Sequence, residues 1–302
     1  IYSVSNRSLG EQLSPVSELA PGALEMIQKL YEQEGEVTGV ETGFDDLDKL
    51  TTGFHKSDLV VLAARPAMGK TAMALNAIWH AAGVKKMPVA IFSLEMSKEQ
   101  LVQRLISQTT RIPTQDLRSG NVKAEDWPKL VRGVGEVSGA PIWIDDTAGA
   151  SLMEMRAKVR RLASRLIAQG GPPLSLVVVD YLQLMIGNNR ENRQQEIAEI
   201  SRGLKVLARD LDVPVLAIAQ LSRAVEQRHD KRPLLSDLRD SGAIEQDADM
   251  VMFLYRDEYY NPDSDDKGIA EVIVGKHRNG PTGKVQLAWL EQYTKFASLA
   301  RR

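Results

Sequence analysis

The sequence of 302 residues contains no cysteine, which excludes disulfide bonds and thiolate metal sites. Histidine is scarce, and the four histidines lack the spacing of metal ligands, so we expect solvated or packing roles for them: His55, His80, His229 and His277. No apolar run approaches the roughly 20 residues needed to cross a bilayer, and the first residues are polar, unlike a signal peptide. These absences favour a cytoplasmic protein with no membrane contact. Because the chain begins at Ile1 and not at Met, we expect a fragment or a processed product.

An excess of charge of one sign is also missing. The 38 basic and 40 acidic residues leave a formal net charge of −2. No global basic field therefore indicates a nucleic acid or an anionic membrane, and any such contact must come from local clusters. The apolar share of 43% is enough for one large core or two small ones.

The first 20 residues are rich in Ser, Gln and Glu without a sustained period, which predicts a linker or tail. After Pro21 and Gly22 the sequence predicts a short helix that ends at Gly35. One face of this helix is apolar and carries Leu24, Ile27, Leu30 and Tyr31. The pattern fits equally well a helix that packs on its own domain and one that docks on another subunit.

From about Val37 onward, strand-like apolar runs alternate with helical patterns. The runs cover residues 58–64, 88–95, 141–145, 174–180, 213–220, 249–255, 269–275 and 284–290. Several are apolar on both faces, as is typical of parallel strands covered by helices. Residues 36–302 are therefore predicted to form an α/β doubly wound domain, with loops at 256–268 and 276–283 and an antiparallel edge made by the last two strands.

Helix signals lie between the runs. Ser97 with Gln100, and Ser151 with Glu154, each form a capping box. An apolar stripe at helical spacing leads into the run at residue 213 and consists of Ile197, Ile200, Leu204, Leu207 and Leu211.

The stretch "AARPAMGKTAMALNA" (63–77) resembles a phosphate-binding loop whose opening glycine is replaced by Ala64. The Gly-Lys-Ser/Thr triplet alone occurs by chance in roughly one chain in seven of this length. Here it follows a strand and opens a helix, the setting in which backbone N–H groups and a helix N-terminus hold phosphate. Glycine is needed beside the lysine, where the backbone approaches the phosphate, whereas alanine can occupy an opening position with ordinary backbone angles. The predicted cradle consists of Ala67, Gly69, Lys70, Thr71 and Ala72, with the Lys70 ammonium on phosphate and the Thr71 hydroxyl on Mg²⁺.

Three further polar residues stand at the ends of predicted strands. Asp180 either caps the next turn or holds Mg²⁺ through its water shell. Glu95 is either a plain residue before a capped helix or the base that deprotonates an attacking water, and Gln220 either ends its strand or senses a γ-phosphate. Since ligands of open α/β sheets bind at the carboxyl ends of strands, one rim that gathers these residues with Lys70 favours the functional alternative.

Two basic segments follow. The first lies between two strands and carries Arg223, Arg228, Lys231, Arg232 and Arg239. Such a run is usually a solvated face, but its "RDSG" (239–242) offers the backbone N–H groups of Ser241 and Gly242 to a phosphate, which makes it a candidate nucleic-acid loop. The second, "GKHRNGPTG", is either an exposed hairpin or a turn whose Lys276 and Arg278 reach phosphates bound by a neighbouring subunit, which would require a ring or filament.

Together these blocks resemble the C-terminal motor domain of the bacterial replicative DnaB helicases. The blocks occur in the order of that family and cover nearly the whole chain: "TGFDDLDKLTTGF", "AARPAMGKTA", "FSLEMS", "VVVDYLQLM", "AQLSRAVEQR", "RPLLSDLRDSGAIEQDADMVMFLYRDEYY" and "KHRNGPTG". An alanine at position 64 is itself a feature of the family.

The resemblance implies a RecA-like fold, ATP and Mg²⁺ as ligands, and a homohexamer around one DNA strand with ATP at each subunit interface. It implies nucleotide-site roles for Lys70, Thr71, Glu95 (the catalytic base), Asp180 and Gln220, and a basic pair offered in trans, Lys276 and the arginine finger Arg278. Channel-loop positions that hold the DNA backbone match Arg223, Arg239, Asp240 and Gly242. Asp240 departs from the glutamate common there; since either acid repels phosphate, contact would use backbone N–H groups.

The resemblance also implies that residues 1–35 are a linker whose helix docks on the adjacent motor domain. Helicase loader, primase and other replisome proteins would be partners, in the cytoplasm and at the nucleoid. We therefore expect an ATP-driven helicase motor that translocates 5′→3′ on single-stranded DNA in replication. The alternatives are a RecA-like recombinase-type ATPase that forms filaments, and a nucleotide-dependent loader or clamp without sustained turnover, against which Glu95 and Arg278 argue.

Overall fold

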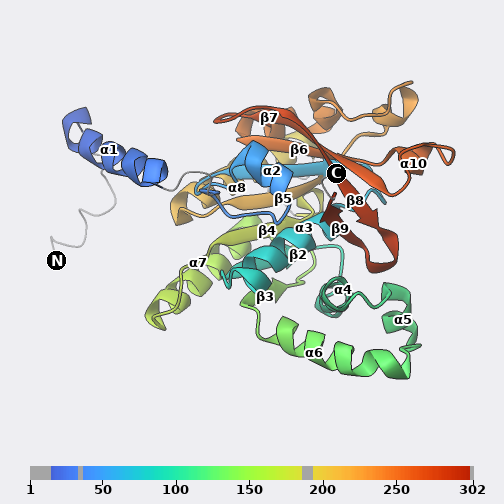
Figure 1. The fold of residues 1–302 in the computed structure, drawn as a ribbon. Helices are drawn as coiled ribbons and strands as arrows, with labels where there is room; N and C mark the ends of the chain where they lie inside the picture. Colours follow the sequence, from blue (N-terminus) through green and yellow to red (C-terminus); the bar gives the residue numbers. More distant parts are fainter. Residues whose placement is uncertain (1–14, 33–36, 186–192, 300–302) are drawn as a thin grey trace. The chain divides into compact units, whose positions relative to one another are not determined.

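The computed structural model describes residues 15–32, 37–185 and 193–299. The chain divides into two compact units, Ile1–Thr38 and Gly39–Arg302, and each is described by itself. The described part of the first unit is one helix, α1 (Val16–Glu32) (Figure 1). The predicted helix start after Pro21 is wrong: α1 already begins at Val16 and contains Pro21. A proline lacks the N–H that a helix interior uses for hydrogen bonding, so Pro21 predicts a helix start from the sequence. In the structure the turns on both sides of Pro21 are helical.

The second unit is built on one nine-stranded sheet with the strand order β3-β2-β4-β5-β1-β6-β7-β8-β9 (Figure 1). The first six strands of this order are parallel, and β7, β8 and β9 continue antiparallel. Their bounds are β1 (Leu59–Ala64), β2 (Val89–Ser93), β3 (Ile142–Asp145), β4 (Leu176–Asp180), β5 (Val215–Gln220), β6 (Met250–Tyr255), β7 (Ile269–His277), β8 (Gly283–Leu290) and β9 (Lys295–Ser298). The mostly parallel sheet and all eight predicted strands are confirmed.

The predicted antiparallel pairing of the two last expected strands, β7 and β8, is confirmed. A further strand that was not predicted, β9, lies outside β8 and closes that side of the sheet. This strand has only four residues and follows a left-handed residue, Thr294, so it carries no alternating pattern of its own. The two predicted loops are also shorter than expected. A four-residue helix, α10 (Asp257–Tyr260), interrupts the first, and β7 and β8 extend into the second.

Helices cover both faces of the sheet. Their bounds are α2 (Asp45–Thr51), α3 (Lys70–Trp79), α4 (Lys98–Thr110), α5 (Thr114–Ser119), α6 (Trp127–Ser138), α7 (Leu152–Ala168), α8 (Arg193–Leu211) and α9 (Gly242–Asp247). Short segments of tighter or wider helix are η2 (His80–Val84), η3 (Ala124–Asp126), η4 (Leu182–Leu184), η5 (Arg223–Gln227), η6 (Leu235–Ser241) and η7 (Glu291–Tyr293). None of the helices within the described ranges is long and apolar enough to span a membrane.

The core has two layers, one on each face, and the alternation of side chains along the strands divides them. On β1, Val60 and Leu62 join the layer formed with α2, α3 and α4, whereas Leu59 and Val61 join the layer formed with α7, α8 and α9. The stripe on α8 supplies Ile197, Ile200, Leu204 and Leu207 to the second layer, and Leu211 packs at its margin. Both predicted capping boxes are present, at the starts of α4 and α7.

Candidate nucleotide site and nucleic-acid interface

The loop between β1 and α3 is shaped by two left-handed residues, Ala67 (φ 63°) and Gly69 (φ 103°). A Cβ on Gly69 would lie 2.8 Å from Phe296 Cζ, so both backbone angle and space require glycine there. Ala64 is an ordinary strand residue, the last of β1, which explains why no glycine is needed at the opening. Ala72 is buried in the first turn of α3.

Lys70 is the first residue of α3, and its side chain folds back over the loop. Its Nζ donates hydrogen bonds to the backbone oxygens of Ala64 and Arg65, both at 3.2 Å. Burial lowers the pKa of Lys70 to about 8, against the opposing effect of the Asp180 and Glu95 carboxylates. The loop therefore carries an ammonium that carbonyl oxygens hold in place and that a phosphate oxygen would hold more strongly.

Thr71 and Asp180 come from different elements and meet at the carboxyl edge of the sheet. The Thr71 hydroxyl donates to Asp180 Oδ2 at 2.6 Å. Asp180, at the end of β4, is buried, and burial raises its pKa although the Thr71 hydrogen bond acts in the opposite direction. A hydroxyl and a carboxylate beside a phosphate loop are the donors that fit Mg²⁺ with its water shell. Within the described ranges no three His, Asp or Glu side chains gather as metal ligands, so water and phosphate oxygens would have to supply the other ligands.

Two further charges act at this edge. Glu95 follows β2 and is exposed. Its negative charge raises the pKa of Lys70, Asp180 and Arg104. Arg104 lies on α4; burial lowers the pKa of its guanidinium, and Asp180 and Glu95 raise it. The sequence did not single out Arg104, which stands in the middle of a helix among ordinary polar residues and reaches the site only through the fold.

Gln220 ends β5 and lies in register with Ala64 at the end of β1. Its backbone is clamped by the Gln183 side chain, which accepts from Gln220 N at 3.2 Å and donates to Gln220 O at 3.0 Å. Gln183, in η4, was not predicted either. Both glutamines border a hollow of about 630 Å³ whose lining extends to Arg223 and Asp237, so the nucleotide edge opens toward the basic segment after β5.

The basic residues of the segment after β5 differ in their contacts. Arg228 forms a two-point ion pair with Asp237 at 2.7 and 2.8 Å, and Arg232 pairs with Glu271 at 2.8 Å. The Lys231 ammonium lies over the Tyr260 ring. These three cations contact protein groups, and their part in the predicted nucleic-acid loop stays a prediction. Arg223 is exposed at the start of η5.

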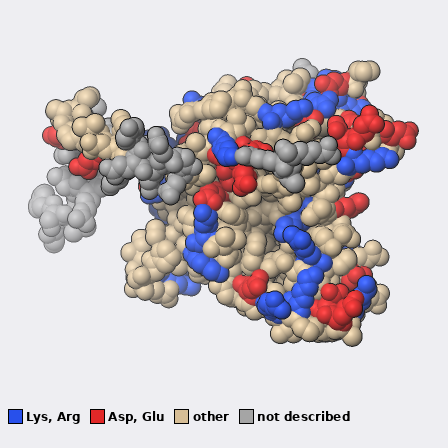
Figure 2. Space-filling view, in the orientation of Figure 1, with Lys and Arg blue, Asp and Glu red and all other residues tan. Residues whose placement is uncertain are grey.

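The "RDSG" segment joins η6 to α9. Gly242, the first residue of α9, is exposed, and a Cβ there would meet no atom within 4 Å. The side chains of Arg239, Asp240 and Ser241 lie outside the described part of the chain. Over the second unit, Figure 2 shows basic and acidic side chains interspersed on the face in view, so no charge of one sign dominates this face.

Lys276 and Arg278 lie at the opposite end of the strands from Lys70. Arg278 N donates to Asp249 O at 2.8 Å, and Asp249 N donates to Leu59 O at the start of β1. The six residues of β1 separate this end from the phosphate loop by about 20 Å. The structure therefore does not bring these two residues to the nucleotide site of their own chain.

At that end, the two side chains hold the last turn of α9. Lys276 Nζ donates to the backbone oxygens of Glu245 and, at 2.7 Å, Ala248. Arg278 donates to Gln246 O and to Asp249 Oδ1, the latter at 3.3 Å. Arg278 is nevertheless 46% exposed, whereas Asp249 is 6% exposed, so the guanidinium can be reached from outside the chain.

Comparison with known proteins places this geometry in context. A family model described as the DnaB-like helicase C-terminal domain matches residues 39–298. A replicative DNA helicase DnaB of Geobacillus stearothermophilus is 51% identical over the whole chain, which spans 66% of that protein's length.

Two solved structures are similar. One, described as an ATPase domain, has a TM-score of 0.89 at 42% identity, covering 96% of this chain and all of that one. A DnaB-like replicative helicase, from a study of its interactions with primase, has a TM-score of 0.85 at 40% identity, covering 99% of this chain and 70% of that one.

Proposed function

The chain belongs to the DnaB-like helicase C-terminal domain family, and on this premise we propose that it is the ATP-driven motor of a replicative DNA helicase. It has the RecA-like fold of the similar ATPase domains. The observation that carries the proposal is the meeting of the phosphate loop with Asp180, through Thr71 at 2.6 Å, beside Lys70, Glu95 and Arg104.

In this proposal ATP binds with its phosphates over Ala67–Ala72, held by backbone N–H groups and the Lys70 ammonium. Thr71 directly, and Asp180 through water, would hold Mg²⁺, which would neutralise charge on the phosphate oxygens. Glu95 accepts a proton from water as the water oxygen bonds to the γ-phosphorus and the bond to the β-phosphate oxygen breaks, giving ADP and phosphate. Arg104 supplies positive charge close to both carboxylates.

A neighbouring copy supplies the rest of the site. Since Lys276 and Arg278 lie about 20 Å from their own phosphate loop, they serve the nucleotide bound by the adjacent subunit, with Arg278 as the finger. Contacts of this head-to-tail kind close into a ring or continue as a helix. The family resemblance favours a homohexameric ring around single-stranded DNA, moving 5′→3′.

Coupling to DNA runs through the end of β5. Gln220 senses the γ-phosphate, Gln183 holds the Gln220 backbone, and the adjoining hollow leads to Arg223. Arg223, Arg239, Asp240 and Gly242 hold the sugar–phosphate backbone, with Asp240 and Gly242 contributing N–H groups. Such contacts are independent of base sequence and weaken steeply with salt.

The remaining parts belong to the same proposal. Residues 1–35 are a linker whose helix docks on an adjacent motor domain, and 36–302 are the motor. A helicase loader, primase and other replisome proteins are partners, and the protein acts in the cytoplasm at the nucleoid. The primase interaction named for one similar structure supports the second of these partners.

The test is ATP turnover and particle mass measured with Mg²⁺, with and without single-stranded DNA. We expect DNA-stimulated hydrolysis by a six-subunit particle, and loss of hydrolysis in Lys70→Ala. Filaments in electron micrographs would favour the recombinase-type alternative, and nucleotide binding without turnover would favour the loader or clamp. Full turnover by a monomer would contradict the shared site.

A further inference from the structure

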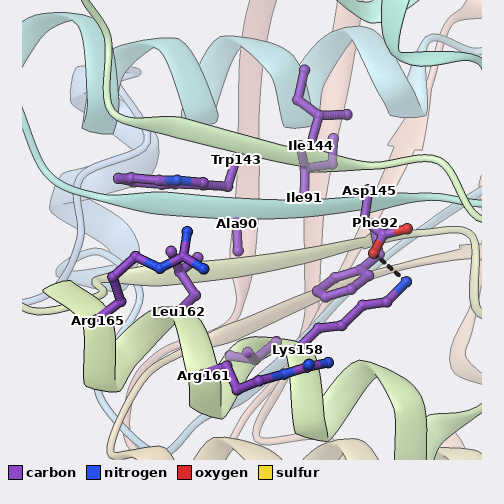
Figure 3. A pocket seen from close by; sticks show the side chains of 11 residues that line it. Ala90, Ile91, Phe92, Trp143, Ile144, Asp145, Lys158, Arg161, Leu162 and Arg165 are labelled. Atoms are coloured by element: carbon purple, nitrogen blue, oxygen red, sulfur yellow. Dashed lines mark ion pairs between the residues drawn. The ribbon is translucent and has the colours of Figure 1, made fainter.

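A pocket of about 260 Å³ lies at the β3 edge of the sheet, between β3 and α7, away from the proposed nucleotide site (Figure 3). Its floor is apolar, with Phe92 from β2, Trp143 from β3 and Leu162 from α7. Figure 3 shows Arg161 and Arg165 on the α7 side of the same pocket. None of the lining residues belongs to the phosphate loop or to the segments assigned to DNA.

The charges of this pocket do not cancel. Lys158 and Asp145 form an ion pair at 2.5 Å and neutralise each other. Arg161 and Arg165 are one helical turn apart, and within the described ranges neither has a carboxylate at ion-pair distance. Arg161 only donates, through Nε, to Ala157 O of its own helix at 3.3 Å. Two uncompensated guanidinium groups therefore stand at an apolar cavity.

Other arginines of α7 behave differently. Arg156 and Arg160 both pair with Asp210, which lies near the end of α8. The helix thus has cations that hold the fold and, beside them, two that pair with no carboxylate of the described chain. A ligand with carboxylates would satisfy this second pair, since guanidinium groups bind carboxylates in two-point geometry.

The backbone beside the pocket is also open. In the described part of the sheet β3 pairs only with β2, and all four of its residues are partly exposed. An edge strand presents N–H and C=O groups along its free side, and an extended peptide can add to it as a further strand. The alternate side chains of such a peptide would point toward the pocket face.

We propose that the β3–α7 pocket is a docking site for an extended acidic segment of a partner protein. The segment adds to the free edge of β3, places one apolar side chain over Trp143 and Leu162, and puts its carboxylates on Arg161 and Arg165. With four residues in β3, the paired part of the segment is short, about four to six residues. A nucleic acid fits less well, because its sugar–phosphate chain has no partners for a sheet edge. Of the cations that line the pocket, Lys158 is paired with Asp145, which leaves Arg161 and Arg165.

The test uses a phage-displayed library of random decapeptides, selected on the whole chain. We expect enriched peptides with Asp or Glu beside apolar residues. Their affinity should fall by about tenfold or more in Arg161→Glu/Arg165→Glu and in Trp143→Ala. The matched control, Arg118→Glu/Arg132→Glu, reverses two exposed arginines elsewhere and should bind as the parent does. Circular dichroism and ATP turnover of each variant establish that it is folded.

Three results would overturn the proposal. In the first, selection yields no acidic enrichment. In the second, the enriched peptides bind the Arg161→Glu/Arg165→Glu variant as well as the parent. In the third, oligothymidylate crosslinks to Trp143 under ultraviolet light and loses affinity in the same variant, which assigns the pocket to nucleic acid. Because none of these three results depends on hydrolysis, failure of the docking proposal and failure of the proposed motor function can be distinguished.

Discussion

At the scale of single residues, the lowered pKa of Lys70 predicts a cost to stability. Its pKa is about 8 in the folded chain against 10.5 in the unfolded chain. Between these two pH values the unfolded chain binds more protons than the folded chain, so the free energy of unfolding rises with pH across this window. Below pH 8 Lys70 is charged in both states, and the full cost of burying its charge then lowers the free energy of unfolding. We expect Lys70→Met to raise the free energy of unfolding at pH 7 by about 1–3 kcal/mol, with no gain above about pH 10.5.

Urea unfolding of the nucleotide-free protein at pH 7 and near pH 10.5 measures this. Lys129→Met, at an exposed position of α6, is the control and should change little. An equal gain in the free energy of unfolding at both pH values would show that the gain does not come from removing the buried charge of Lys70.

Arg104 is the residue whose role only the fold reveals. Because its charge lies near Asp180 and Glu95, we expect Arg104→Gln to lower kcat for ATP by about 10²-fold or more while nucleotide affinity changes little. Steady-state turnover and equilibrium binding of a fluorescent ATP analogue separate the two effects. Arg118→Gln, an exposed arginine of α5, should leave both unchanged. A parallel loss of affinity would instead assign Arg104 to ground-state binding.

At the scale of elements, α9 depends on side chains from β7. Lys276 satisfies carbonyl oxygens at the end of this six-residue helix, where a positive charge is favourable. We expect Lys276→Met to speed amide hydrogen exchange of residues 243–249 by about tenfold, while β6 exchanges as before. Lys267→Met, in the loop before β7, is the comparison. Unchanged exchange in α9 would contradict the role of Lys276 in holding it.

Elements with strong periodic patterns were predictable, and those made by long-range contacts were not. The eight apolar runs and both capping boxes each carry their own signal, whereas β9 forms only because β8 offers it an edge. The same holds in the site. Thr71 opens the helix after β1 and Asp180 ends β4, so both were expected at the carboxyl edge of the sheet. Arg104 and Gln183 carry no such signal in the sequence, because only the fold brings them to this edge. The pairing of Arg228 with Asp237 and of Arg232 with Glu271 was hidden for the same reason.

At the scale of the whole molecule, a shared site predicts complementation. Lys70→Ala and Arg278→Ala should each be inactive alone. When the two variants are mixed one to one and their subunits exchange freely, a subunit with intact Arg278 faces a subunit with intact Lys70 at about a quarter of the interfaces. We expect turnover to recover toward about a quarter of the parent rate. No recovery, with mixing verified by mass, would contradict the trans role of Arg278.

DNA binding is predicted to be electrostatic and local. Arg223→Ala should weaken binding of oligothymidylate and reduce the slope of log affinity against log salt concentration by about one. Fluorescence anisotropy at several salt concentrations gives the slope, and Arg132→Ala serves as control. An unchanged slope would remove Arg223 from the phosphate contacts.

The phosphate loop and Arg278 stand at the two ends of β1, which gives each subunit a front and a back that cannot be exchanged. In an assembly joined through these ends, every subunit would offer Arg278 to one neighbour and its phosphate loop to the other. Hydrolysis in one subunit would then change its contacts with one neighbour differently from its contacts with the other. Successive events around a closed circle would accordingly follow one rotational sense, set by the layout of the monomer and needing no separate timing device.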